Sequence, residues 1–188
     1  RERVLRAAIA LADERGIESL SMRELGRRLE VEAMSLYNHV ANKDDILDGM
    51  MDLVVGEIDL PSGEVGWKEA MRRRAISARD VFSRHPWASI LMDSRESSGP
   101  ARLRYLDWVI GALRRAGFSI DQAAKAFSVL DSYVYGFGRQ QLNMSAGDGA
   151  SLEEMAEAFR RAIPADEFPY LTEMVVEWAL KGDYDDTA

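Results

Sequence analysis

Side chains that can contact nucleic acid are concentrated between residues 33 and 43. Donors suited to phosphate oxygens are the hydroxyl, imidazole and ammonium groups of Ser35, Tyr37, His39 and Lys43. Asn38 can pair bidentately with adenine, and Ala33 and Met34 can touch a thymine methyl group. These residue types predict a helical segment, 33 to about 40, whose first residues face base edges in the major groove of DNA.

The helix before this segment extends the same surface. Its first residues are Ser21, Met22 and Arg23. Amides at a helix start can hold a phosphate, and we expect Arg23 to contact a base or a phosphate. Two residues have a second interpretation, since Tyr37 can cover the core with its ring and His39 can pack or cap a helix.

Helices must position these side chains, and local signals predict where they lie. An apolar stripe that ends at Gly16 predicts the first helix, through Val4, Ala8, Leu11 and Ala12. Ser21 with Glu24 forms a capping box that begins a second, short helix. Asn42, followed by Asp44 and Asp45, caps a third helix through about Ile58.

The spacing of these helices fits a helix-turn-helix unit, in which two short helices are joined by a short turn and braced by another. The inward positions are Leu25, Leu29, Val31 and Leu36. Gly26 is small where two helix axes must cross closely, and Arg27 and Arg28 indicate a solvated face rather than DNA ligands.

The motif SMRELGRRLEVEAMSLYNHVANKDDILDGMMDLV, residues 21–54, resembles the TetR family of bacterial transcriptional regulators, and the tetracycline-repressor branch most. The resemblance is carried by Val31-Glu32, Leu36-Tyr37, His39-Val40, Asn42-Lys43 and Ile46-Leu47. One departure is Glu30 at the turn, where Gly is usual and a left-handed non-Gly residue costs about 1–2 kcal/mol. Either Glu30 takes that conformation or the turn has another geometry.

The resemblance implies an all-α fold with two domains. Residues 1–48 form the helix-turn-helix DNA-binding head, and residues 49–188 form a body that binds a ligand and dimerises. The implied function is a repressor that a small-molecule effector releases from a palindromic operator in double-stranded DNA. The alternative is a constitutive DNA-binding protein with a filled core and no effector.

The body pattern is helical throughout. Helices are expected over about residues 67–83, 86–92, 100–117, 119–144, 151–163 and 170–182, with a linker at 60–63. Gly136 and Gly138 interrupt the long helix at a cost of about 1 kcal/mol each, which suggests close helix packing. We assign this helix and the last one to a four-helix homodimer interface, the alternative being packing within one chain. The last helix places Leu171, Met174, Val175 and Trp178 on one side.

Apolar and aromatic residues of the body are candidates for a ligand cavity. They are Met71, Arg74, Ala78, Phe82, Trp87, Tyr105, Trp108, Phe127, Asp131 and Val134. The same stripes also fit an ordinary core, and Arg74 and Asp131 can extend to solvent or pair with each other. By resemblance, a tetracycline site uses His ligands to a chelated metal, and His85 is the only His of the body. We therefore expect an apolar or aromatic effector.

Composition excludes several classes of site. The 188 residues contain no Cys and 2 His, which excludes thiolate metal sites, disulfides and a three-His metal site. Glu153 and Glu154 are adjacent and point apart on a helix, and neither a glycine-rich phosphate loop nor a Glu-x-x-His motif occurs. We expect no enzyme activity, no catalytic residue, no metal and no cofactor.

Charge and hydropathy limit the partners. The net charge is −8, but residues 1–43 carry +1 and residues 44–188 carry −9, so DNA contact is expected in the head alone. No apolar run approaches the length of a membrane span, and the charged start is not a secretory signal. These features favour a cytoplasmic protein. The sequence begins at Arg1 and not at Met, which leaves open whether residues precede Arg1.

Overall fold

The computed structural model describes residues 1–62, 65–92, 99–145 and 152–179, and every regular element among them is helical. This confirms the expected all-α fold. The chain forms two units, Arg1–Gln140 and Gln141–Ala188, which are described separately. None of the helices described is long and apolar enough to cross a membrane.

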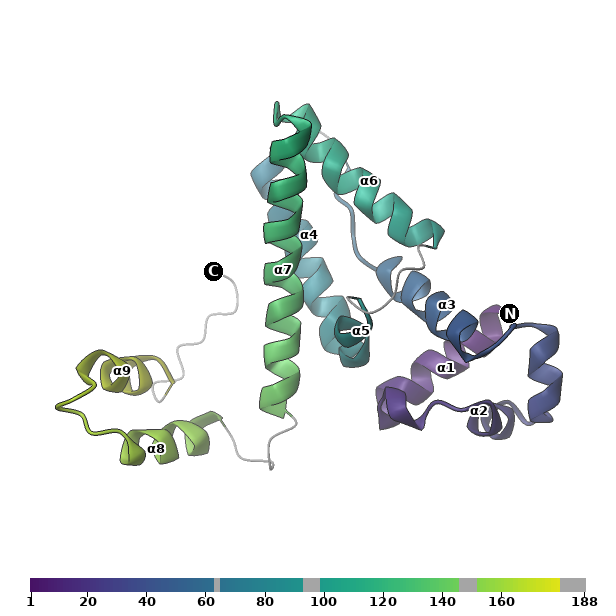
Figure 1. Ribbon diagram of the computed structural model, residues 1–188, viewed down its shortest axis with the longest axis horizontal. Coiled ribbons are helices and arrows are strands. Elements are labelled where there is room, and N and C mark those ends of the chain that lie inside the picture. The colour runs from purple at the N-terminus through teal and green to yellow at the C-terminus, as the bar shows by residue number, and fades with distance from the viewer. Residues whose placement is uncertain (63–64, 93–98, 146–151, 180–188) are drawn as a thin grey trace. The chain divides into compact units, whose positions relative to one another are not determined.

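The head is built by α1 (Glu2–Arg15), a 3₁₀ turn η1 (Ile17–Ser19), α2 (Met22–Leu29), the 3₁₀ helix η2 (Ala33–Asn38) and the start of α3 (Lys43–Val55) (Figure 1). Both expected caps are present. The Ser21 hydroxyl accepts from the Glu24 amide at 3.2 Å, and the Asn42 side chain accepts from the Asp45 amide at 2.8 Å. Gly16 ends α1 with φ 81°, which suits glycine.

The turn between α2 and η2 is a Schellman motif. The Val31 amide donates to the Gly26 carbonyl at 2.9 Å and the Glu30 amide to the Arg27 carbonyl at 3.3 Å. Glu30 has φ 56° and ψ 41°, so the unusual residue does take the left-handed conformation. A Cβ on Gly26 would lie 2.8 Å from the Val31 carbonyl oxygen, which confirms that the crossing needs glycine.

Two expected helices of the first unit are shorter or tighter than the sequence predicts. The segment expected as a helix over 33–40 is a 3₁₀ helix that ends at Asn38, because Ser35 donates both its amide and its hydroxyl to the Glu32 carbonyl and tightens the first turn. α3 ends at Val55 rather than Ile58. A 3₁₀-type turn follows, in which the amides of Glu57 and Ile58 donate to the carbonyls of Val54 and Val55, three residues earlier.

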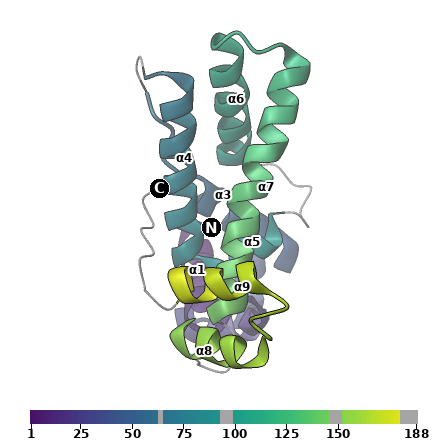
Figure 2. The same ribbon diagram turned by 90° about the vertical axis from the view of Figure 1, so that its left-hand side faces the viewer.

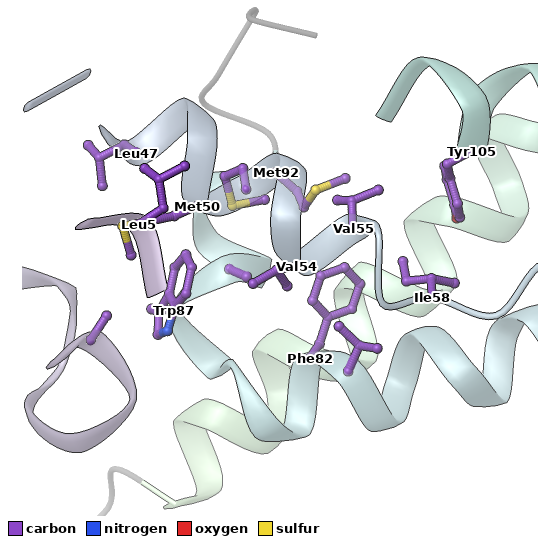
Figure 3. Close-up of a cluster of buried hydrophobic side chains, with 14 of the residues drawn as sticks. Leu5, Leu47, Met50, Val54, Val55, Ile58, Phe82, Trp87, Met92 and Tyr105 are labelled. Carbon is purple, nitrogen blue, oxygen red and sulfur yellow. The ribbon is translucent and has the colours of Figure 1, made fainter. Parts of the chain in front are cut away.

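One apolar core runs from the head into the body along α3 (Figure 3). Leu5 of α1 contacts the region of Leu47 and Met50, while Val54 and Val55 lie near Phe82 and Met92. All of these residues are buried. The helix that begins just after η2 is therefore packed into the body.

The body part of the first unit comprises α4 (Trp67–Arg84), α5 (Pro86–Leu91), α6 (Pro100–Arg115) and α7 (Ile120–Ser145). α4, α6 and α7 lie side by side (Figure 2), joined by hydrogen bonds among Arg74, Tyr105 and Asp131. Ser119 caps α7, since its hydroxyl accepts from the Gln122 amide at 3.2 Å.

The second unit contains α8 (Leu152–Ala162), α9 (Pro169–Met174) and a π-helical turn, η3 (Val175–Ala179). The last α-helix is thus shorter than expected, and residues 180–182 lie outside the described part. Residues 146–151, which include Ser151 at the start of the helix expected over 151–163, and the surroundings of Trp178 and Gly138 also lie outside it. Val175 is buried, whereas Met174 is 50% exposed.

Candidate nucleic-acid interface and body cavity

The head presents its polar side chains to solvent. Arg23, Met34, Tyr37, Asn38, His39 and Lys43 are exposed, Met34 by 76%. Tyr37 is 46% exposed, so part of its surface faces solvent and part is covered by the protein. Leu36 and Val40, between these residues, are buried and hold the segment in place. The outward face therefore offers an apolar tip flanked by hydrogen-bond donors.

Four residues expected to contact DNA have structural partners. Met22 and Ala33 are partly buried, and Met22 packs against the core. The Ser21 hydroxyl accepts from the Glu24 amide, and the Ser35 hydroxyl donates to the Glu32 carbonyl at 2.7 Å. Their hydroxyl groups consequently stabilise local structure in the free protein.

The other arginines of the head are largely neutralised. Arg28 binds Glu14 with both guanidinium nitrogens at 2.6 Å, while Arg15 and Arg27 both bind Glu24. The hydrogen bond from Arg28 lowers the pKa of Glu14, and the hydrogen bond from Arg27 lowers the pKa of Glu24. Within the residues described, Arg23 and Lys43 take part in no ion pair. Arg23 and Lys43 are thus the cations that face solvent beside η2.

A buried polar cluster joins three helices of the body. Arg74 Nη1 of α4 donates to Asp131 Oδ1 of α7 and to the Tyr105 hydroxyl of α6, both at 2.6 Å. Tyr105 donates to Asp131 Oδ1 at 3.1 Å, and Tyr135 donates to Asp131 Oδ2 at 2.9 Å. Arg74 is fully buried and Asp131 is 5% exposed, so these two residues pair rather than extend to solvent.

Burial perturbs this cluster. Desolvation, reinforced by the Asp131 carboxylate, raises the pKa of Tyr105, and desolvation with the neighbouring Tyr105 and Asp131 raises the pKa of Tyr135. The remaining guanidinium nitrogens of Arg74, Nε and Nη2, are buried without a hydrogen-bond partner. The cluster therefore keeps unused donor capacity beside Asp131.

A cavity of about 400 Å³ borders the cluster between α6 and α7. It is lined by Met92, Arg102, Tyr105, Leu106, Phe127, Ser128, Asp131, Ser132, Tyr135, Gly136 and Arg139. Tyr105, Phe127 and Asp131 were predicted from the sequence as ligand-binding residues, whereas the other lining residues were not. The spacing of Ser128, Ser132 and Tyr135 on one face of α7 is the signal that could have found them.

The remaining ligand candidates lie elsewhere. Met71, Ala78, Phe82, Trp87 and Val134 belong to the buried core, which was the alternative interpretation of their stripes. Trp108 lines a second cavity of about 340 Å³ with Trp67 and Arg115. At Gly136 a Cβ would meet nothing within 4 Å among the described residues, so the described part of the first unit gives no reason for a glycine there.

Carboxylates connect α1 and α3 to the body, and besides Asp52 and Asp13 they include Glu57, just after α3, which accepts from Arg84 Nη2 at 2.7 Å. Asp52 Oδ1 of α3 accepts from the amides of Ala101 and Arg102 at 2.8 and 3.1 Å. Asp13 Oδ1 of α1 accepts from Trp87 Nε1 at 2.7 Å and lies 2.8 Å from His85 Nδ1. In the described part of the chain, no group of three or more His, Asp or Glu side chains could hold a metal ion.

Comparison with known proteins matches both parts of the chain. A model of the tetR family of bacterial regulatory proteins matches residues 4–50, and one of the tetracyclin repressor-like C-terminal domain matches residues 60–187. In three dimensions, 93% of the chain superposes on 84% of the TetR family protein ActR of Streptomyces coelicolor, crystallised with actinorhodin, with a TM-score of 0.78 and 27% identity.

The curated relatives of similar sequence are also transcriptional regulators. The chain is 39% identical over 137 residues to an HTH-type transcriptional regulator of Saccharopolyspora erythraea, covering 72% of this chain and 58% of the relative. It is 32% identical over 165 residues to the HTH-type transcriptional repressor DrrR1 of Streptomyces coeruleorubidus, covering 87% and 61%. The chain therefore spans about three fifths of the length of these relatives.

Proposed function

The chain belongs to the TetR family of bacterial regulatory proteins, and we propose that it is a homodimeric transcriptional repressor that a small-molecule effector releases from a palindromic operator. The observation that carries this proposal is the exposed row of donors on η2 and α3, supported from behind by Leu36 and Val40. Residues 1–48 are the DNA-binding domain, and residues 49–188 bind the effector and dimerise. A protein that regulates transcription in bacteria works in the cytoplasm, as a binder rather than an enzyme.

Each head residue has a separate role in this proposal. Arg23, Tyr37, His39 and Lys43 position the head on phosphate oxygens, and Asn38 specifies a base. One η2 segment covers only a few base pairs, so two heads related by two-fold symmetry require an inverted repeat.

The effector is proposed to enter the cavity beside Tyr105, Phe127 and Asp131. Phe127, Leu106 and Met92 supply an apolar wall, while the serine and tyrosine hydroxyls supply polar contacts, a mixture typical of small-molecule sites. An aromatic compound fits this wall, and ActR was crystallised with actinorhodin. A constitutive DNA-binding protein is the second candidate, which the mutual pairing of Arg74 with Asp131 favours.

Selection of DNA from a random pool by the purified chain tests the function. We expect an inverted repeat, with recovery reduced when cell extract supplies the effector. Lys43→Ala should recover little DNA, whereas Arg72→Ala on the body helix α4 should behave as the unmodified chain. Light scattering that gives a monomer with unchanged affinity for DNA would contradict the dimeric site. A thermal-shift screen of aromatic compounds distinguishes a sensor from a constitutive binder.

A further inference from the structure

The first turn of α6 is stabilised by a residue of another helix. α6 begins after Gly99 without a side-chain cap, and its first turn contains no acidic residue. The amides of Ala101 and Arg102 donate instead to Asp52 Oδ1 of α3, at 2.8 and 3.1 Å. Asp52 thus satisfies amides that the helix cannot and places a negative charge at its positive end.

The approach of Asp52 depends on Gly99. A Cβ on Gly99 would lie 2.3 Å from both Cγ and Oδ1 of Asp52, so any side chain there must displace the carboxylate. Position 99 therefore provides an independent way to break the same contact.

The turn that Asp52 binds is also a wall of the cavity. The Arg102 amide is bound by Asp52, while the Arg102 side chain lines the cavity, and Tyr105 and Leu106 line it one turn later. Tyr105 in turn contacts Arg74 and Asp131. A group that enters the cavity and displaces this turn must consequently either move Asp52 or break its hydrogen bonds.

We propose that Asp52 is the positioning residue through which the cavity acts on α3 and the DNA-binding head. This inference rests on the proposed function, in which the cavity accepts the effector. The other connections run from Asp13 to His85 and Trp87 and from Glu57, just after α3, to Arg84. They involve no cavity-lining residue and together hold α1 and the end of α3 on the body as a pivot. Movement of α6 then displaces α3 while α1 stays attached, which changes the angle of the head.

A tryptophan introduced on α7 can fill the cavity in place of an effector. Ser132→Trp places a ring in the cavity, because Ser132 is exposed and lines it. Tyr133→Trp is the matched control, since Tyr133 is 73% exposed and lies outside the lining. Amide hydrogen exchange of α3 is measured on the full chain without DNA and corrected for global stability from urea unfolding.

With Asp52 present, Ser132→Trp should change α3 exchange about fivefold or more relative to Tyr133→Trp. The difference should disappear in Asp52→Ala and in Gly99→Ala, and return in Asp52→Asn, which keeps an acceptor oxygen. Asp13→Asn should alter exchange equally with either tryptophan. A cavity effect that persists in Asp52→Ala, or that is absent with Asp52 present, overturns the inference. Because this assay contains no DNA, failure to select an operator counts against the proposed function alone.

Discussion

The head and the body treat their polar residues in opposite ways. In the head, Asn38 and Lys43 face solvent, and the bonds that support them are local, such as the one from Asn42 to the Asp45 amide three residues away. In the body, Arg74 and Asp131 are buried and meet across 57 residues of sequence. A surface that binds a polyanion can leave its donors to water, whereas buried charges must satisfy one another.

Removing one partner of the buried pair should have the largest effect. Arg74→Met leaves the Asp131 carboxylate buried without its cation, and the free energy of unfolding should fall by about 3–5 kcal/mol. Urea unfolding followed by circular dichroism measures the change. Arg73→Met removes only an exposed pair with Glu69 and should change stability by about 0–1 kcal/mol.

The double variant Arg74→Met with Asp131→Leu separates structure from binding. Replacement of both charges should cost less stability than Arg74→Met alone, the remaining cost being about 1–3 kcal/mol for each of the Tyr105 and Tyr135 hydroxyls that lose Asp131 as an acceptor. If the pair is structural only, the variant keeps its response to an effector found by screening, and if the pair binds the effector, it keeps operator binding and ignores the effector. Loss of both stability and DNA binding would contradict both interpretations.

In the head, a substitution at the turn should lower stability through crowding of the backbone rather than through a buried charge. Gly26→Ala places a methyl group 2.8 Å from the Val31 carbonyl and 3.1 Å from the Ala33 nitrogen, so the turn must shift, at about 1–3 kcal/mol. Operator binding should be lost with it. Gly66→Ala is the control, because an added Cβ there would meet none of the described residues within 4 Å. An equal loss of stability in Gly66→Ala would contradict the explanation by crowding.

The head is easier to predict from the sequence than the body, because its supporting contacts are local and those of the body are not. Caps at Ser21 and Asn42 and the glycine at position 26 act within a few residues, so the sequence alone predicts the head. The cavity depends on which face of α7 meets α6, and the spacing of Ser128 and Ser132 marks one face of α7 without showing which helix that face meets. Spacing placed Tyr105 and Asp131 on the inner faces but could not separate them from core residues such as Phe82.

The segment at residues 33–38 shows a limit of local signals within the head. Its length of six residues does not decide the helix type, because α5 and α9 also have six residues and are α-helices. The double use of the Glu32 carbonyl by Ser35 then favours the tighter 3₁₀ form. Residue type predicted which side chains face outward, while the helix type depended on a hydrogen bond that spacing does not show.

Exposed head residues should affect DNA binding but not stability. Asn38→Ala should relax preference at one base position by about 1–3 kcal/mol. Lys43→Ala should weaken all sequences alike and flatten the salt dependence by about one unit of slope. Binding to base-substituted operators across a salt series measures both. Uniform loss in both variants would make Asn38 a phosphate contact instead.

Alkaline pH should destabilise the body through its buried phenols. The pKa values of Tyr105 and Tyr135 are raised above 10.0, so the folded state keeps both neutral while the unfolded state ionises. Their contribution is complete below about pH 10 and is lost above it, with a slope of up to about 1.4 kcal/mol per pH unit for each phenol. Urea unfolding between pH 8 and 11 measures this, and Tyr135→Phe should reduce the slope. An unchanged slope would contradict the assignment.

The smallest effect should come from the strained turn of the head. Glu30 has φ 56°, a conformation that costs a non-Gly residue about 1–2 kcal/mol. Glycine removes this cost but loses more backbone entropy on folding, about 0.5–1 kcal/mol. Glu30→Gly should therefore stabilise the chain by about 0.5–1 kcal/mol, or about 2 °C in Tm, measured by calorimetry.

Two variants separate backbone strain from charge at this turn. Glu32→Gly is the matched control, because Glu32 has φ −62° and glycine there brings only the entropy loss, so stability should fall. Glu30→Gln removes the carboxylate but keeps the left-handed residue, and should leave Tm unchanged while DNA binding strengthens as much as in Glu30→Gly. Equal stabilisation by Gln and Gly would mean that charge repulsion, and not the backbone, makes position 30 unfavourable. The head would then resemble the body, where charge governs stability.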